Sequence, residues 1–432
     1  MTRLKYNTDD SLWDCLKEEC DVEMSNFLEN YDSDGDIEEG YETFKSKLND
    51  VVKKVLSQGK KLRKRTVRNV IRDNGEIRAM KYKRNILYHE RSLVVNKEER
   101  NCIAKAIREQ EKKIKKLTIK LKDSYMKKLM EKIERLKHED AKGMWKELKK
   151  LGRRSTKSKS TQVMLDLEGN EVSGEEAKNI WQEAFRKLGI EDTTDPKFDA
   201  DFAAGLGYRV DQIQEESREH FVEELDVDIT LDEVVEAISK LKRYKAAGVD
   251  GIVTEVLKYG GDKVCLAVLE LCRTAWRTET VIQDWAKGLI FPIFKEGRDS
   301  DKRNPADYRG VTLLSIVGKV YTGILNNRLI SWCEENKILL EEQGGFRPRR
   351  GCPDQIFSLS ELLKNRKDIS TYCCFIDVRK AFDRVHRNGL CTRLADEGIK
   401  GKMWRAIKSI DGSVQSCVLV EDSETDWFDV DT

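Results

Sequence analysis

The sequence has few of the residues that build metal sites or disulfide frameworks. Its 432 residues include only four histidines, and its eleven cysteines form no Cys-x-x-Cys pair. A structural zinc site usually uses such pairs or clustered histidines, and a disulfide framework usually has an even number of cysteines. The composition indicates neither kind of site. It favours an intracellular, reducing compartment, in the nucleus, the cytoplasm or both.

Long apolar segments are also missing. The N-terminus has no apolar stretch of the kind found in signal peptides. No run of about 18 apolar residues, the length that spans a bilayer, occurs anywhere in the chain. We therefore expect no secretion by the signal-peptide route and no membrane partner.

Charge is abundant but unevenly distributed. Charged residues make up 37% of the chain, yet the formal net charge is only +2. Residues 1–40 hold 13 acidic and 3 basic side chains, whereas residues 51–160 hold 37 basic and 13 acidic ones. The basic stretch is suited to a polyanion such as nucleic acid, but it is equally compatible with a solvated helical surface.

The N-terminal half predicts three successive regions. Residues 1–50 are expected to be a flexible acidic lead-in without a core. A calcium loop is not expected there, because the pattern that begins at Asp32 lacks the required glutamate at its twelfth position. Residues 51–160 predict a basic helical or coiled-coil arm. Within it, apolar residues at steps of three, four and seven over 102–151 favour self-association. Residues 161–228 predict a small α/β linker region with an irregular acidic tail.

One stretch combines a hydrophobic segment with an acid. Residues 371–386 read TYCCFIDVRKAFDRVH. Tyr372 to Ile376 predict a short buried strand, and the residues from Val378 onward predict a helix. Asp377 would then stand at the rim of a sheet, where open α/β enzymes keep their sites. An aspartate in this position is also a common turn residue or helix N-cap, so both interpretations remain open.

The motif Phe375-x-Asp377-x-x-Lys380-Ala381-Phe382-Asp383-x-Val385 resembles the first catalytic motif of reverse transcriptases from LINE-type (non-LTR) retrotransposons. Three earlier segments are similar to other motifs of that family. They are the KAAGVDGI segment at 245–252, the pair formed by Lys295-Glu-Gly297 and residues 307–315, and the glycine-rich QGGFRPRRGC loop at 343–352.

This resemblance implies an α+β fold of the right-hand polymerase type. Residues 229–370 would form the fingers and residues 371–432 a partial palm, a small mixed sheet with helices, preceded by the long basic helical arm. The implied activity is RNA-directed DNA polymerisation from an RNA template and a DNA primer with dNTP substrates. The implied cofactor is Mg²⁺, bound in a two-metal site.

The resemblance also assigns roles to individual residues. The catalytic residue is Asp377, and the metal ligands are Asp377 and the carbonyl of Val378. The nucleotide-binding residues are Lys295, Arg309, Lys380, Ala381 and Phe382. The template-binding residues are Gly345, Phe346, Arg347 and Arg350.

One essential part of such a site is not found. Two metal ions need carboxylates from at least two places, and no aromatic-x-Asp-Asp motif follows Asp377. We therefore expect an incomplete metal site, a chain that is inactive alone, and a C-terminal third with exposed apolar faces. The alternative is a non-catalytic nucleic-acid-binding or coiled-coil interaction protein derived from a retroelement, acting through residues 53–160.

Overall fold

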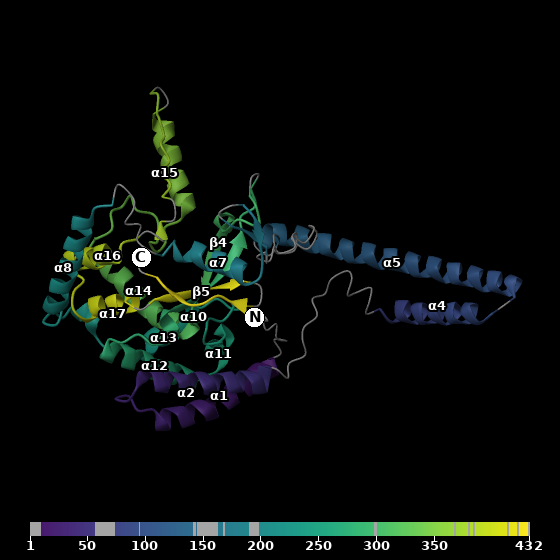
Figure 1. The fold of residues 1–432 in the computed structure, drawn as a ribbon, viewed down its shortest axis with the longest axis horizontal. Coiled ribbons are helices and arrows are strands. Elements are labelled where there is room, and N and C mark those ends of the chain that lie inside the picture. The colour runs from purple at the N-terminus through teal and green to yellow at the C-terminus, as the bar shows by residue number, and fades with distance from the viewer. Residues whose placement is uncertain are drawn as a thin grey trace. The chain divides into compact units, whose positions relative to one another are not determined.

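The computed structural model describes most of the chain. The described residues are 10–56, 74–94, 96–140, 144, 163–166, 169–189, 198–297, 300–366, 369–378, 381–382, 385–412, 414–420 and 423–430. They fall into two compact units, Met1–Gly59 with Ser158–Thr432, and Lys60–Lys157 (Figure 1). Helices and small sheets occur together, in agreement with the predicted α+β class. Among the described helices, none is both long and apolar enough to cross a bilayer.

The smaller unit contains a pair of helices, α4 (Gly75–Leu93) and α5 (Lys97–Glu139). Each begins at an asparagine whose side chain accepts a backbone N–H, Asn74 from Ile77 and Asn96 from Glu98, both at 2.9 Å. The two helices pack together, and α5 confirms the predicted long amphipathic helix as far as Glu139. The basic residues at 57–73 and the predicted linker at 151–162 lie outside the described residues.

The acidic N-terminal region is folded, so the prediction of a flexible lead-in was wrong. Helices α1 (Asp10–Asn30) and α2 (Ile37–Val51), followed by a π-helical turn (Val52–Leu56), pack against α12 (Asp262–Thr278). They add apolar side chains to the main core, including Leu16, Met24 and Tyr41. The high average charge of the region concealed this helical stripe of apolar residues.

The rest of the main core is a cluster of helices. Its elements are α9 (Glu223–Asp226), α10 (Leu231–Lys240), α11 (Thr254–Tyr259), α12, α13 (Gln283–Ala286) and α14 (Ile316–Glu335). A capping box starts α10, where Thr230 accepts from the backbone of Glu233 and Glu233 accepts from the backbone of Thr230.

The larger sheet has the order β4-β3-β5-β6, and β7 also pairs with β5. Its strands are β3 (Lys287–Phe294), β4 (Tyr308–Leu313), β5 (Gln415–Val420), β6 (Ser423–Glu424) and β7 (Phe428–Asp429). β3 is antiparallel to β4 and parallel to β5. Helix α7 (Glu175–Arg186) packs on this sheet through Trp181 and Phe185.

A short hairpin and three further helices also belong to the described part of the chain. The hairpin is formed by the antiparallel strands β1 (Met164–Leu165) and β2 (Glu171–Val172). α8 (Ala200–Glu216) packs on α16 (Arg387–Asp396), so residues 200–216 are not the irregular tail we predicted. α16 ends before α17 (Lys402–Asp411) because Gly398 and Gly401 adopt positive φ between the two helices.

Candidate functional site

The hairpin of β3 and β4 brings Lys295 and Arg309 to one face. Arg309 pairs directly with Ile293, and the Lys295 N–H donates to the Asp307 carbonyl at 2.8 Å. Paired residues in an antiparallel sheet share a face, and residues two apart along a strand do so as well. Lys295 and Arg309 are therefore diagonal neighbours, with Cα atoms roughly 7–8 Å apart. Both side chains are exposed, and neither forms an ion pair with another described residue.

The two faces of this hairpin differ in their surroundings. The face with the two cations also exposes Phe291, Ile293 and Val311 to solvent. The other face packs on α7, where the ring of Tyr308 meets Trp181 edge to face at a centroid distance of 4.7 Å. One face is thus held by the core while the other presents two cations and apolar side chains to a ligand.

The junction between β4 and α14 rests on a buried turn that sequence reasoning treated only as a motif. A Cβ at Gly248 would lie 2.5 Å from the carbonyl carbon of Leu314, so only glycine allows this close approach of the two backbones. Ser315, directly after Leu314, caps α14 by accepting the N–H of Gly318 at 3.0 Å. The KAAGVDGI segment therefore supports the end of the strand that carries Arg309.

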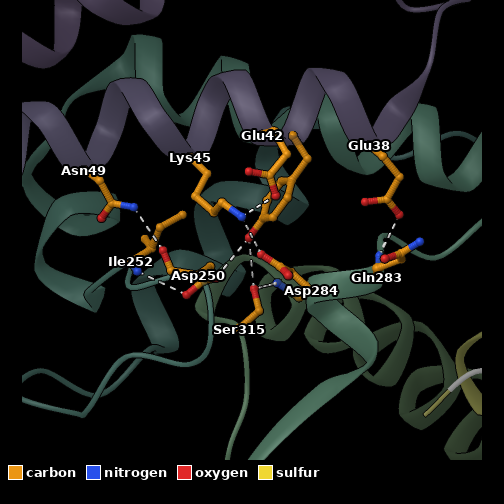
Figure 2. Close-up of polar contacts among 11 residues, drawn as sticks. Glu38, Glu42, Lys45, Asn49, Asp250, Ile252, Gln283, Asp284 and Ser315 are labelled. Carbon is orange, nitrogen blue, oxygen red and sulfur yellow. Dashed lines mark hydrogen bonds and ion pairs between the residues drawn. The ribbon is translucent and has the colours of Figure 1, made fainter. Parts of the chain in front are cut away.

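Asp250 lies at the centre of this junction and is only 3% exposed (Figure 2). Its carboxylate accepts a hydrogen bond from the Tyr41 hydroxyl at 3.0 Å and one from the Ile252 N–H at 3.1 Å. The Tyr41 hydroxyl also lies 3.3 Å from the Ser315 hydroxyl. Burial raises the pKa of Asp250, although hydrogen bonds from Ser315 and Tyr41 oppose the shift.

Three further contacts tie α2 to this part of the core (Figure 2). Asn49 donates to the Asp250 carbonyl at 3.0 Å, and Lys45 forms an ion pair with Asp284 at 2.8 Å. Glu38 accepts the N–H of Gln283 at 2.7 Å. Sequence reasoning missed this role of the N-terminal region, although apolar residues at helical spacing around Tyr41 were a usable signal.

The glycine-rich loop presents only part of its predicted template surface. Phe346 is 86% exposed at a positive φ of 61°, and its ring meets the exposed ring of Phe382 edge to face with centroids 6.0 Å apart. The structure thus brings together one residue from each of two predicted motifs. Around Gly345, no atom would contact an added Cβ, so the backbone there is open.

The two loop arginines differ in their environments. The Arg347 side chain is only 7% exposed and forms a bidentate pair with Glu334 of α14, at 2.9 and 2.7 Å. It also donates to the Leu340 carbonyl at 2.9 Å. The hydrogen bonds that Arg347 donates to Glu334 lower the pKa of the Glu334 carboxyl. Arg350 is more exposed and pairs with Glu341. Arg347 is turned inward and anchors the loop, whereas Arg350 stays at the surface.

The segment that carries Asp377 differs from its prediction. Residues 371–378 form no strand, and Phe375 and Ile376 are 84% and 86% exposed. The predicted buried strand was therefore wrong, and so was the burial of Cys373 and Cys374, which are both exposed. A strand forms only when its backbone N–H and C=O groups pair with a neighbouring strand. None of the described strands pairs with residues 371–378.

Only part of the helix predicted from Val378 onward can be compared, because residues 379–380, among them Lys380, and residues 383–384 lie outside the described residues. Val378, Ala381 and Phe382 are exposed, and the next described α-helix begins at Arg387. The helix α15 (Cys352–Asn365), which precedes this segment, has no buried residue, so its apolar side chains are open to solvent as well.

The donor set for metal is incomplete in the described part of the chain. Over those residues, no group of three or more His, Cys, Asp or Glu side chains lies close enough together to hold an ion. Two ions need several carboxylates, and Asp377 supplies one. The residues that are described do not fit a two-metal site, and no catalytic step follows from their geometry.

Comparison with known proteins covers the region that contains β4, the glycine-rich loop and the exposed acid. A family model described as reverse transcriptase (RNA-dependent DNA polymerase) matches residues 298–421. That range contains Arg309, the glycine-rich loop and Asp377. The matched region is therefore a reverse transcriptase domain.

The curated relatives come from retrotransposons. A probable RNA-directed DNA polymerase from transposon BS of Drosophila melanogaster is 30% identical over 168 residues, which cover 38% of this chain and 18% of the relative. The RNA-directed DNA polymerase from mobile element jockey of Drosophila funebris is 28% identical over 186 residues, covering 42% and 20%. The chain spans about a fifth of the length of these relatives. Both relatives are named as RNA-directed DNA polymerases of mobile elements, in agreement with the family that the motifs resemble.

Proposed function

We propose that residues 229–432 hold a nucleotide and a template strand for RNA-directed DNA synthesis, with 229–370 as the fingers and 371–432 as part of the palm. The observation that carries this proposal is the placing of Lys295 and Arg309 on one exposed face of the β3–β4 hairpin. A lysine point charge beside a planar arginine fork suits the oxygens of a triphosphate. The exposed apolar residues of the same face give the nucleotide a surface to lie against.

The template strand would lie against the glycine-rich loop. Phe346 is exposed and available to stack on a base, Gly345 allows close approach of a backbone, and Arg350 can reach a phosphate. Arg347 serves this surface indirectly in our proposal, by fixing the loop to α14. The contact of Phe346 with Phe382 supports a template site next to the nucleotide site.

Asp377 is the proposed catalytic carboxylate. When Mg²⁺ is bound, Asp377 and the Val378 carbonyl would be two of its ligands, and the metal would supply charge stabilisation and activation of the primer hydroxyl. Since the donor set among the described residues is incomplete, we expect the isolated chain to bind nucleotide and template without joining them. Eleven free cysteines support an intracellular, reducing location.

The proposal is tested by titrating the full chain with a fluorescent dNTP in the presence of Mg²⁺. Lys295→Gln and Arg309→Gln are each expected to weaken binding about tenfold, because each removes a charge-assisted contact. Lys263→Gln, an exposed lysine on α12, is the matched control and should bind like wild type. Wild-type protein that binds no dNTP, or variants that bind as well as the control, would refute the proposal.

A further inference from the structure

Helix α5 carries a run of positive charge that the polymerase motifs do not explain. Between Lys112 and Lys128 there is a single acidic residue, Asp123, and there are eight lysines. The lysines are Lys112, Lys113, Lys115, Lys116, Lys120, Lys122, Lys127 and Lys128. All eight are exposed, and none forms an ion pair with a described residue.

Five of these lysines share one side of the helix. Lys112, Lys116 and Lys120 follow one another at steps of four residues, which stacks them along the axis with a rise of about 6 Å each. Lys113 and Lys127 fall on the same side at 3.6 residues per turn. We call these five residues the lysine ladder. The buried Ile107 and Ile114 lie on the opposite side of α5, which leaves the ladder in solvent.

The ladder is electrostatically unfavourable in the isolated protein. Lys112 with Lys116, and Lys116 with Lys120, are like-charge pairs at a spacing of four residues, and such pairs destabilise a helix. Other helices of this chain pair their lysines with acids, as in Lys240 with Glu236 at 2.7 Å. The nearby Glu111 instead accepts the hydroxyl of Tyr88 at 2.9 Å.

We propose that the lysine ladder binds the phosphate backbone of a nucleic acid. A row of unpaired ammonium groups along a rigid helix matches a row of phosphates along a strand, and an anion bound there removes the repulsion between the lysines. Lysine contacts to phosphates set position and affinity and do not read sequence. The site is separate from the hairpin with Lys295 and Arg309, so it does not depend on the nucleotide site proposed above.

An anionic membrane is the competing polyanion, and the structure favours nucleic acid. Helices that bind membranes combine a basic face with a free apolar face that inserts among the lipids. In α5 the apolar residues Ile107 and Ile114 are already buried, in the segment that packs on α4. Ile119 and Met130 of α5 are exposed, but they stand eleven residues apart and form no continuous apolar face, so the ladder offers charge without a surface that could insert into lipid.

The test uses the full chain and measures how the affinity for short single-stranded RNA, single-stranded DNA and duplex DNA changes between about 50 and 200 mM salt. Glutamine replaces lysine at four ladder positions, Lys112, Lys113, Lys116 and Lys120. The matched control makes the same change at four exposed lysines outside α5, Lys17, Lys242, Lys263 and Lys337. Glutamine preserves helix propensity, and circular dichroism confirms that the helices remain.

We expect the ladder variant to show a slope of log affinity against log salt that is shallower by about three for single strands, and a loss of affinity of at least tenfold at the lower salt. The control should keep the wild-type slope. A ladder variant with the slope and affinity of the control would overturn the proposal. Binding to vesicles of anionic lipid that depends on the ladder, with unchanged nucleic-acid binding, would overturn it in favour of a membrane.

Discussion

The hydroxyl of Tyr41 donates a hydrogen bond of 3.0 Å to the carboxylate of Asp250. Through this contact the acidic N-terminal region supports the turn beneath the strand that carries Arg309. The N-terminal helices α1 and α2 therefore belong to the core of the larger unit. A domain trimmed to the family match at 298–421 would lose this support.

Removing the Tyr41 hydroxyl should destabilise the fold. Tyr41→Phe leaves Asp250 buried without one of its donors, and a lost partner of this kind costs about 1–3 kcal/mol. Urea unfolding measures the change as a lower midpoint with an unchanged slope. Tyr208→Phe, at an exposed tyrosine of α8, is the control and should leave the midpoint where it is. An unchanged midpoint in Tyr41→Phe would show that the contact does not contribute.

The raised pKa of Asp250 predicts a pH dependence of stability. Burial raises this pKa above its ordinary value of 3.8, so the folded chain holds the proton more tightly than the unfolded chain. Its favourable contribution is complete below pH 3.8 and is lost as the pH rises through the raised value. Asp250→Asn does not titrate, so the stability of the variant relative to wild type should increase from about pH 4 to 7. A difference that stays flat over this range would contradict the assignment.

The two arginines of the glycine-rich loop should respond differently to substitution. Arg347→Gln breaks the bidentate pair with Glu334 that anchors the loop to α14, and we expect a lower unfolding free energy. Arg350→Gln should change stability by less than about 0.5 kcal/mol, because its pair is partly exposed, while it weakens template RNA binding. A stable Arg347→Gln protein with weakened RNA binding would restore Arg347 to the template site.

Phe382 gives a prediction about the sugar of the nucleotide. From the resemblance, we propose that the bulky ring of Phe382 lies beneath the sugar and excludes a 2′ hydroxyl. Phe382→Ala should bring the affinity for an rNTP close to that for the matching dNTP, measured by competition against a fluorescent dNTP. The control is Phe202→Ala, at an exposed phenylalanine of α8. A preference for dNTP that survives in Phe382→Ala would contradict this role.

Local chemistry made much of the fold predictable. The capping box at Thr230 and Glu233, the strand of alternating and continuous hydrophobics that became β3, and the long helix α5 each follow from residues close together in sequence. The motif around Asp377, together with three earlier segments, was enough to indicate the family. These features need only short-range patterns, which a single sequence displays directly.

Long-range partners account for what could not be predicted. Tyr41 and Asp250 are 209 residues apart, and nothing in either segment announces their contact. Arg347 was predicted to bind the template because the motif alone does not show that its side chain pairs with Glu334 on the preceding helix. The residues before Asp377 have the composition of a strand, but a strand forms only with a neighbour, and the described sheet does not provide one.

The affinity for a nucleoside triphosphate relative to the matching monophosphate tests the central claim most directly. Lys295 and Arg309 are proposed to contact the triphosphate, so wild type should prefer dTTP over dTMP by at least tenfold, and the double variant Lys295→Gln/Arg309→Gln should bind both equally weakly. A wild-type protein without this preference, or a double variant that keeps it, would contradict the account.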